Sequence, residues 1–282
     1  MGDGNTPDRE IGAPNMKLPY FEVAAFTTNA FGGNPAGVCP LAAWLPDRVL
    51  QGIAANNNLP ETAFVVPRGG DFDLRWFTPT VEIDLCGHAT LAAAAVLFNE
   101  CGRQGSEVRF HSRSGGLTVI RDGELFTLDF PARPPGPCDT PEALGRGLGG
   151  KPREVFKARD YLALYASEAE VRALQPDFAA LKGLDCLGII VTAPGTDTDF
   201  VSRFFAPRAG VNEDPVTGSA HCTLIPFWAA RLGKTKLSAR QVSARGGELF
   251  CELVADRVLI GGKAMLYLRG EIDIEDVLSS GN

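Results

Sequence analysis

Residues 84–91 read Asp-Leu-Cys-Gly-His-Ala-Thr-Leu, and residues 213–221 read Glu-Asp-Pro-Val-Thr-Gly-Ser-Ala-His. Each stretch follows a strand-like run that ends at Phe77 or Phe205 and is followed by a proline. Each then passes through a small residue and a glycine into a helical segment. The two units lie about 130 residues apart, which is too long for a solenoid repeat and fits a duplicated, two-lobed protein. A chance similarity between two strand-to-helix turns is the simpler alternative.

Apolar runs around both stretches predict the secondary structure. Runs bounded by glycine, proline and asparagine are typical of strands, and alanine- and leucine-rich segments are typical of helices. We expect strands at residues 20–26, 36–39, 62–66, 71–77, 108–111, 116–121, 125–130, 186–192, 200–205, 242–244, 250–254, 257–260 and 264–268. We expect helices at residues 45–56, 89–100, 168–174 and 220–232.

A proline-rich segment at residues 131–141 predicts a linker between the two halves. We expect residues 1–15 to be a disordered extension and residues 16–132 to form an N-terminal lobe. Residues 133–282 then form a C-terminal lobe, whose last strands could cross back to the first lobe. The mixture of strands and helices predicts an α+β protein.

The composition excludes several classes of function. The chain has 282 residues, 45% hydrophobic content and a formal net charge of −7, so it can build a large core but offers no basic surface for nucleic acid. No apolar run has the roughly 20 residues that a membrane helix needs. The polar residues 1–15 contain no apolar signal core, and the seven cysteines include no Cys-x-x-Cys pair. We therefore expect reduced thiols and a cytoplasmic location.

The two glycine-containing turns are candidate anion-binding sites. A helix that opens on glycine and small residues exposes backbone N–H groups at the positive end of its dipole. Two such openings in related lobes should face each other across a cleft, where a carboxylate or a developing enolate would bind. No arginine or lysine lies inside either turn, so the backbone would supply much of the binding. The sequence contains no nucleotide-binding glycine motif.

Polar residues near the turns are the catalytic candidates. Glu61 lies between a predicted helix and an apolar strand, where partial desolvation would favour general base chemistry. His88 lies at the first helix opening, and Asp214 lies four residues before Gly218. From the pattern alone, simpler interpretations are an exposed glutamate at a strand start, a capping or core histidine, and an aspartate in an Asp-Pro turn.

Cys86 and Thr217 occupy equivalent positions in the two units. A thiol beside a helix N-terminus can have a lowered pKa, which would suit proton transfer or nucleophilic attack. A small buried residue is the more common role of a cysteine. The three histidines lack the close paired spacing of zinc motifs, so we expect no catalytic metal.

Five motifs together resemble the PhzF-like family of phenazine-biosynthesis-like proteins. They are residues 33–38 (Gly-Asn-Pro-Ala-Gly-Val), 58–64 (Asn-Leu-Pro-Glu-Thr-Ala-Phe) and 77–79 (Phe-Thr-Pro), with the two opening stretches at 84–91 and 213–221. They occur in the family's order. The resemblance implies the diaminopimelate-epimerase-like fold, in which two pseudo-symmetric lobes each wrap a mixed or antiparallel barrel-like sheet around a central helix.

The resemblance also implies an activity without cofactors. Glu61 matches the family's acid/base glutamate, which in the phenazine enzyme moves a proton between two carbons of a dihydro-hydroxyanthranilate. His88 and Asp214 match residues that hold the substrate, and Gly87, Gly218 and Ser219 match the anion-binding turns. The residues around the turns differ from those of the true phenazine enzyme. We therefore expect an isomerase acting on a small carboxylate, and a homodimer is the usual oligomeric state of such proteins.

Two alternatives remain open. More distant relatives, the diaminopimelate epimerases and proline racemases, use two cysteines as opposed bases. Cys86 resembles the first of these cysteines, but Thr217 stands in place of the second, and its hydroxyl is too weak an acid to replace a thiol. Cys86 could instead oppose Glu61 in a two-base epimerase. The other alternative is a non-catalytic binding protein that uses an enzyme fold.

Overall fold

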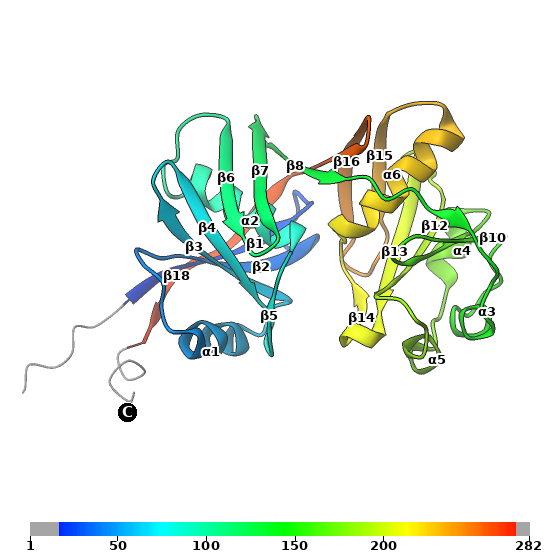
Figure 1. Ribbon diagram of the computed structural model, residues 1–282, viewed down its shortest axis with the longest axis horizontal. Coiled ribbons are helices and arrows are strands. Elements are labelled where there is room, and N and C mark those ends of the chain that lie inside the picture. The colour runs from blue at the N-terminus through cyan, green and yellow to red at the C-terminus, as the bar shows by residue number, and fades with distance from the viewer. Residues whose placement is uncertain (1–16, 275–282) are drawn as a thin grey trace, which may run out of the picture.

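The structure is a computed structural model that describes residues 17–274. In the first lobe, a strongly bent sheet surrounds one helix (Figure 1). Its elements are β1 (Lys17–Ala25), β2 (Asn34–Pro40), α1 (Asp47–Asn57), β3 (Glu61–Arg68), β4 (Asp71–Phe77), β5 (Glu82–Ile83), α2 (Gly87–Asn99), β6 (Glu107–Ser112), β7 (Gly115–Asp122) and β8 (Leu125–Pro131).

The second lobe repeats this plan around α6 (Figure 1). Its elements are β9 (Gly136–Pro137), α3 (Glu142–Gly147), β10 (Glu154–Lys157), β11 (Tyr161–Leu164), α4 (Glu168–Ala173), α5 (Phe178–Lys182), β12 (Ile189–Pro194), β13 (Phe200–Ala206), the 3₁₀ turn η1 (Pro207–Ala209), β14 (Val211–Asp214), α6 (Gly218–Leu232), β15 (Lys236–Gln241), β16 (Gly247–Val254) and β17 (Arg257–Gly262). The expectation of a two-lobed α+β fold is confirmed.

The two central helices are built for burial on all sides. Eleven residues of α2, from His88 to Phe98, are buried. Ten of the fifteen residues of α6 are buried as well. A helix that is apolar around its whole circumference belongs inside a protein. Residues of both helices pack in the same main hydrophobic cluster, so the core fixes the N-termini of α2 and α6 relative to each other.

The last two strands connect the lobes. β17 pairs antiparallel with β16 of the second lobe and with β8 of the first. The chain then enters β18 (Ala264–Asp273), which pairs antiparallel with β1 along the strand's whole length. Strand pairing therefore runs without a break from one lobe to the other. The proposed lobe limits, 16–132 and 133–282, remain a prediction, and the expected extension at residues 1–15 lies outside the described residues.

One detail of the expected secondary structure is wrong. The strand expected at residues 242–244 is absent, and β15 ends just before it at Gln241. The alternation of buried Leu237, Ala239 and Gln241 with more exposed neighbours marks the true strand. The segment 131–141 is also more than a linker, because β9 within it pairs with β10. No helix among residues 17–274 has the length and apolar character needed to cross a membrane.

Candidate active site

The openings of α2 and α6 meet where the two lobes join. The N-cap residues Cys86 and Thr217 are both extended, and neither forms a side-chain capping hydrogen bond. A methyl group added to Gly218 would lie 4.0 Å from the Cα atom of Gly87. The first turns of both helices therefore present uncapped N–H groups close together, and such groups favour an anion.

Glu61 is brought to this junction by the end of α1. The helix ends at Asn58, which adopts the left-handed conformation (φ 51°) that asparagine tolerates. The chain turns through Leu59 and Pro60 and starts β3 at Glu61. The amide of Asn57 donates a hydrogen bond to the Thr62 hydroxyl at 3.1 Å, which secures the turn. Residue 61 is thus held at the first position of a buried strand.

Glu61 and His88 face each other across the first opening. The Nε2 atom of His88 lies 3.1 Å from Oε2 of Glu61, and their side chains are 8% and 17% exposed. The two atoms form a close ion pair, and among residues 17–274 neither has a further hydrogen-bond partner. Buried polar atoms are normally satisfied, so a ligand group is the natural partner for this pair.

Cys86 lies on the other side of the same imidazole. Its sulfur is 3.4 Å from Nδ1 of His88. Burial raises the pKa of the Cys86 thiol, and the nearby charge of Glu61 acts in the same direction. Burial alone would lower the pKa of His88, but Cys86 and then Glu61 outweigh that effect and raise the pKa well above its ordinary value. The imidazole between these two side chains therefore favours its protonated form.

Asp214 belongs to a hydrogen-bonded cluster at the second opening. Its carboxylate accepts hydrogen bonds from the Asn34 amide at 2.8 Å and from the Thr217 hydroxyl at 2.6 Å. Desolvation raises the pKa of Asp214, although the charge of His88 opposes the shift. Asn34 also lies 3.3 Å from Nδ1 of His88, but its two amide hydrogens serve the nearer acceptors, Asp214 and the Val216 carbonyl. Asn34 therefore links the two openings.

Gln241 fixes the backbone of the second opening. It accepts a hydrogen bond from the Thr217 N–H at 2.9 Å and donates one to the Asp214 carbonyl at 2.7 Å. It also donates to the Thr217 hydroxyl at 3.1 Å. Gln241 is fully buried, so these bonds form away from water. The loop before α6 is rigid as a consequence.

An arginine reaches the second opening from outside the turn. Nη2 of Arg159, in the β10–β11 turn, donates a hydrogen bond to the Ser219 hydroxyl at 3.2 Å. The expectation that the backbone would supply much of the binding stays a prediction, and a cation from a distant segment lies beside the α6 opening. The strands β10 and β11, which position this arginine, leave no signal inside the two turns.

The described residues include one group of potential metal ligands, formed by Glu61, Cys86 and His88 with ligand atoms within 4.8 Å of one another. Cys86 approaches Nδ1 of the imidazole, whereas Glu61 approaches Nε2. The same three side chains can also pass a proton along, because the imidazole lies between the thiol and the carboxylate.

The structure brings the expected site residues together. Glu61, Cys86, Gly87 and His88 form one side, while Asp214, Thr217, Gly218 and Ser219 form the other. Sequence reasoning missed Asn34, Gln241 and Arg159 as members. The sequence signal for Asn34 is the glycine before it. Gly33 has a positive φ of 63° and lies so close to the Ala25 carbonyl that no side chain would fit, so the turn that carries Asn34 requires glycine.

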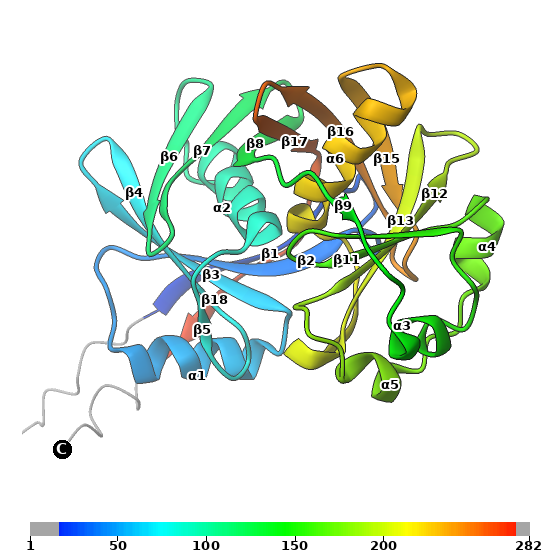
Figure 2. The same cartoon turned by 45° about the vertical axis from the view of Figure 1, so that its right-hand side comes forward.

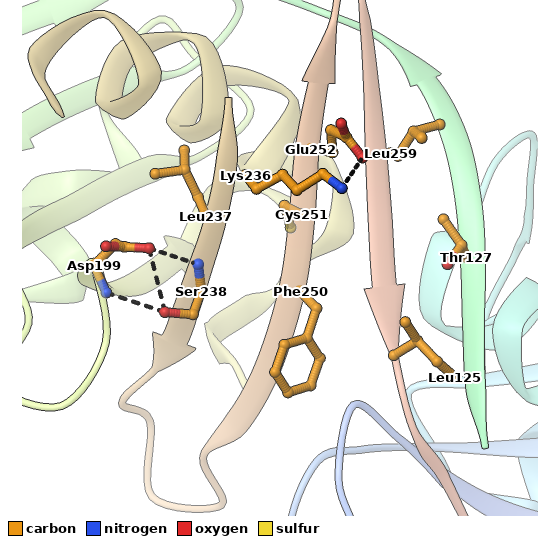
Figure 3. Close-up of a pocket in the computed structure, with 10 residues that line it drawn as sticks. All are labelled: Leu125, Thr127, Asp199, Lys236, Leu237, Ser238, Phe250, Cys251, Glu252 and Leu259. Carbon is orange, nitrogen blue, oxygen red and sulfur yellow. Dashed lines mark hydrogen bonds and ion pairs between the residues drawn. The ribbon is translucent and has the colours of Figure 1, made fainter. Parts of the chain in front are cut away.

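A separate groove of about 480 Å³ lies on the outer face of β8, β15, β16 and β17 (Figure 3). Phe250 and Leu259 contribute to its apolar wall, and Asp199 bonds to Ser238 at one end. None of the expected site residues lines this groove. Its position gives no reason to move the candidate active site away from the helix openings.

Comparisons with known proteins agree with this arrangement. A family model described as phenazine biosynthesis-like protein matches residues 23–270. A Pseudomonas aeruginosa protein named as an uncharacterized isomerase is 56% identical, and the match covers 92% of this chain and 100% of that protein. The human phenazine biosynthesis-like domain-containing protein is 40% identical, with 91% of this chain and 99% of that protein covered.

Solved structures show the same relationship. The crystal structure of a PhzF-family protein from Enterococcus faecalis is 50% identical, with a TM-score of 0.91 over 92% of this chain and 100% of that one. A hydroxyproline epimerase from Agrobacterium vitis shares the fold at 13% identity, with a TM-score of 0.61 over 93% of this chain and 94% of that one. The chain belongs to the phenazine biosynthesis-like, or PhzF, family.

Proposed function

We propose that this protein is a cofactor-independent isomerase that moves a proton on a small carboxylate substrate, with Glu61 as the single acid/base residue. One observation carries the proposal. Oε2 of Glu61 lies 3.1 Å from Nε2 of His88, beside two converging helix openings, and within residues 17–274 these buried atoms have no hydrogen-bond partner beyond this ion pair. The names of the related isomerases are consistent with this reaction class.

The groups around the site divide the work of the reaction. Glu61 removes an acidic C–H proton, and the N–H groups of both helix openings stabilise the resulting anion. His88, as a cation, orients the substrate and balances the charge of Glu61. Asp214, held by Asn34 and Thr217, accepts a hydrogen bond from an amine or hydroxyl of the substrate. Glu61 then returns the proton to another carbon on the same face.

The arrangement supports one base more than two. Inversion at a carbon needs acid/base groups on opposite faces of the substrate. Glu61 and Cys86 both come from the first lobe and flank one imidazole. Thr217, the residue opposite, uses its hydroxyl as a hydrogen-bond donor to Asp214. The raised pKa of Cys86 also makes a thiolate unfavourable.

Proton exchange in heavy water tests the proposal. Small amino and hydroxy carboxylates, including trans-4-hydroxy-L-proline, would be incubated with the enzyme and followed by NMR. We expect solvent deuterium, or a migrated proton, in at least one compound. Glu61→Gln should reduce the rate about 10²- to 10⁴-fold, the usual contribution of a positioned acid/base. The matched control Glu107→Gln, whose side chain is exposed on strand β6 of the same lobe, should keep the wild-type rate.

Two outcomes would contradict this assignment. Full activity of Glu61→Gln would remove Glu61 from the mechanism, and inversion with label at one carbon would favour the two-base alternative. A second readout does not depend on turnover. The ring signals of His88 should titrate above the ordinary histidine range in the wild type. In Glu61→Gln they should titrate at lower pH, because a neighbouring negative charge has been removed.

A further inference from the structure

Arg159 is held firmly beside the opening of α6. Its guanidinium donates to the Asp160 carboxylate, with a shortest distance of 2.7 Å from Nη2. The Asp160 side chain is only 1% exposed and also accepts a hydrogen bond from the Gly188 N–H at 3.1 Å. The same Nη2 atom of Arg159 reaches the Ser219 hydroxyl, while 35% of the arginine side chain remains exposed. Arg159 is therefore an oriented cation with a free surface.

Arg133 is a second cation near the same helix, and its charge has no partner. Its backbone N–H donates to the Cys222 carbonyl at 2.8 Å, which ties the β8–β9 connection to α6. Its Nη1 atom is buried without a hydrogen-bond partner. Within residues 17–274 its guanidinium takes part in no ion pair. The Arg133 side chain is part-exposed, but its buried Nη1 atom lacks an acceptor, and a buried donor without an acceptor is unfavourable, so an anionic group is the expected partner.

The two arginines lie against one face of α6. Ser219 and Cys222 are three residues apart and so occupy neighbouring positions on the helix surface. Burial raises the pKa of the Cys222 thiol to about 11, and the charges of Arg133 and then Arg159 oppose that shift. Figure 2 shows the connection from β8 to β9 running along α6 at the boundary between the lobes.

We propose that Arg133 and Arg159 bind an anionic group of the substrate, a carboxylate or a phosphate, at the opening of α6. The charges support one anion: Asp160 balances Arg159, and Arg133 remains unbalanced. Guanidinium groups match the planar geometry of carboxylates and the oxygens of phosphates. This inference rests on the proposed function, because it assigns the substrate's acidic group to the second lobe and its reacting carbon to the first.

Anion binding by the whole protein tests this proposal. Malonate and inorganic phosphate serve as probes, measured by calorimetry at low ionic strength. We expect at least one probe to bind, and the relative affinities distinguish a carboxylate site from a phosphate site. Arg133→Gln should weaken binding about tenfold or more, as expected for losing a charged hydrogen bond. Arg133→Lys should weaken it less. Arg231→Gln, which removes a cation from the far end of α6, should bind as the wild type does.

Thermal unfolding without added anion separates a binding role from a structural one. Because the buried Nη1 atom of Arg133 has no acceptor among residues 17–274, its removal in Arg133→Gln should leave the Tm equal to that of the wild type or higher. A clear fall in Tm would show that Arg133 supports the fold and would overturn the proposal. Equal probe affinities in Arg133→Gln and the wild type, or no binding of either probe, would overturn it as well.

Failure of the acid/base mechanism and failure of the anion site can be distinguished. Glu61→Gln should bind malonate and phosphate normally, because Glu61 is not placed in the anion site. If Glu61→Gln stays active while Arg133→Gln loses anion binding, the proposed mechanism is wrong and the anion site remains. If Glu61→Gln is inactive while Arg133→Gln binds both probes normally, the mechanism stands and the anion site is wrong.

Discussion

The two helix openings have the same architecture but different chemistry. The opening of α2 carries Cys86 and His88, and within the described residues the ion-paired atoms of His88 and Glu61 have no further hydrogen-bond partner. At the opening of α6, Thr217 is tied to both Asp214 and Gln241. One copy of the duplicated turn therefore keeps reactive groups available, while the other is locked by hydrogen bonds. The difference indicates that one lobe supplies proton transfer and the other holds the ligand.

The largest expected loss of stability follows removal of the Gln241 side chain, which holds the loop before α6 by hydrogen bonds. Gln241→Leu leaves the Thr217 N–H and the Asp214 carbonyl buried without their partner. At about 1–3 kcal/mol for each unsatisfied group, we expect a loss of about 4 kcal/mol in the free energy of unfolding. Urea denaturation measures it. Gln51→Leu is the matched control, because Gln51 donates one part-buried bond to Thr78, and it should lose about 1 kcal/mol or less. Similar losses in both variants would contradict a lock at Gln241.

The next effect is a dependence of stability on pH, which we expect from His221, one helical turn inside α6. Burial lowers the pKa of His221 to about 4, from an ordinary 6.5. Between these pH values the unfolded chain binds more protons than the folded chain, so stability falls as the pH decreases from 6.5 to 4. At 1.36 kcal/mol per pKa unit, His221 should account for about 3 kcal/mol of that fall.

The variant His221→Phe isolates this contribution, because it removes the titrating group and keeps a ring beside Phe200. Urea unfolding at pH 7 and pH 4 should show a smaller loss of stability in the variant than in the wild type, by about 3 kcal/mol. Equal losses in the two proteins would show that His221 does not titrate in this range. His88 contrasts with His221, since its pKa is raised and its charge is retained.

The smallest effect should follow removal of the Cys86 thiol. Cys86→Ala deletes one buried sulfur and should cost about 1 kcal/mol of stability, a typical value for a point substitution. Turnover should fall by less than about tenfold, well below the 10²- to 10⁴-fold loss expected for an acid/base residue. Steady-state turnover of Cys86→Ala, measured in parallel with that of Glu61→Gln and the wild type, tests this expectation. A loss as large as that of Glu61→Gln would restore Cys86 as a second base.

Much of the fold could be predicted from local patterns. The helix openings and the duplication were visible because glycine and small residues before an apolar helix leave a strong signal. The strand β15 was misplaced because the buried member of its alternating pattern at residue 241 is a glutamine, which does not look like a core residue. Gln241 is buried because backbone groups of the next loop satisfy its amide, and a tertiary contact of that kind leaves no local pattern.

The candidate site shows the same limit. Residues 61, 86, 88, 214 and 217–219 lie in recognisable motifs, so they could be named in advance. Arg133 and Arg159 could not, because each is an ordinary arginine until the chain folds back beside α6. Their roles depend on their neighbours in the fold. Arg159 pairs with the buried Asp160, whereas Nη1 of Arg133 has no partner among residues 17–274. Contacts between segments that are far apart in the sequence cannot be read from the sequence of one protein.

The pairing of β18 with β1 has a consequence for biosynthesis. Lys17 and Asp273 are paired residues, so the first lobe completes its sheet with nearly the last described part of the chain. A ribosome releases the N-terminal lobe long before that strand emerges. Until β18 has been synthesised, the edge of β1 that it pairs with is exposed in the nascent lobe, and an exposed strand edge promotes aggregation. Loss of the final twenty residues would damage the beginning of the protein more than its middle.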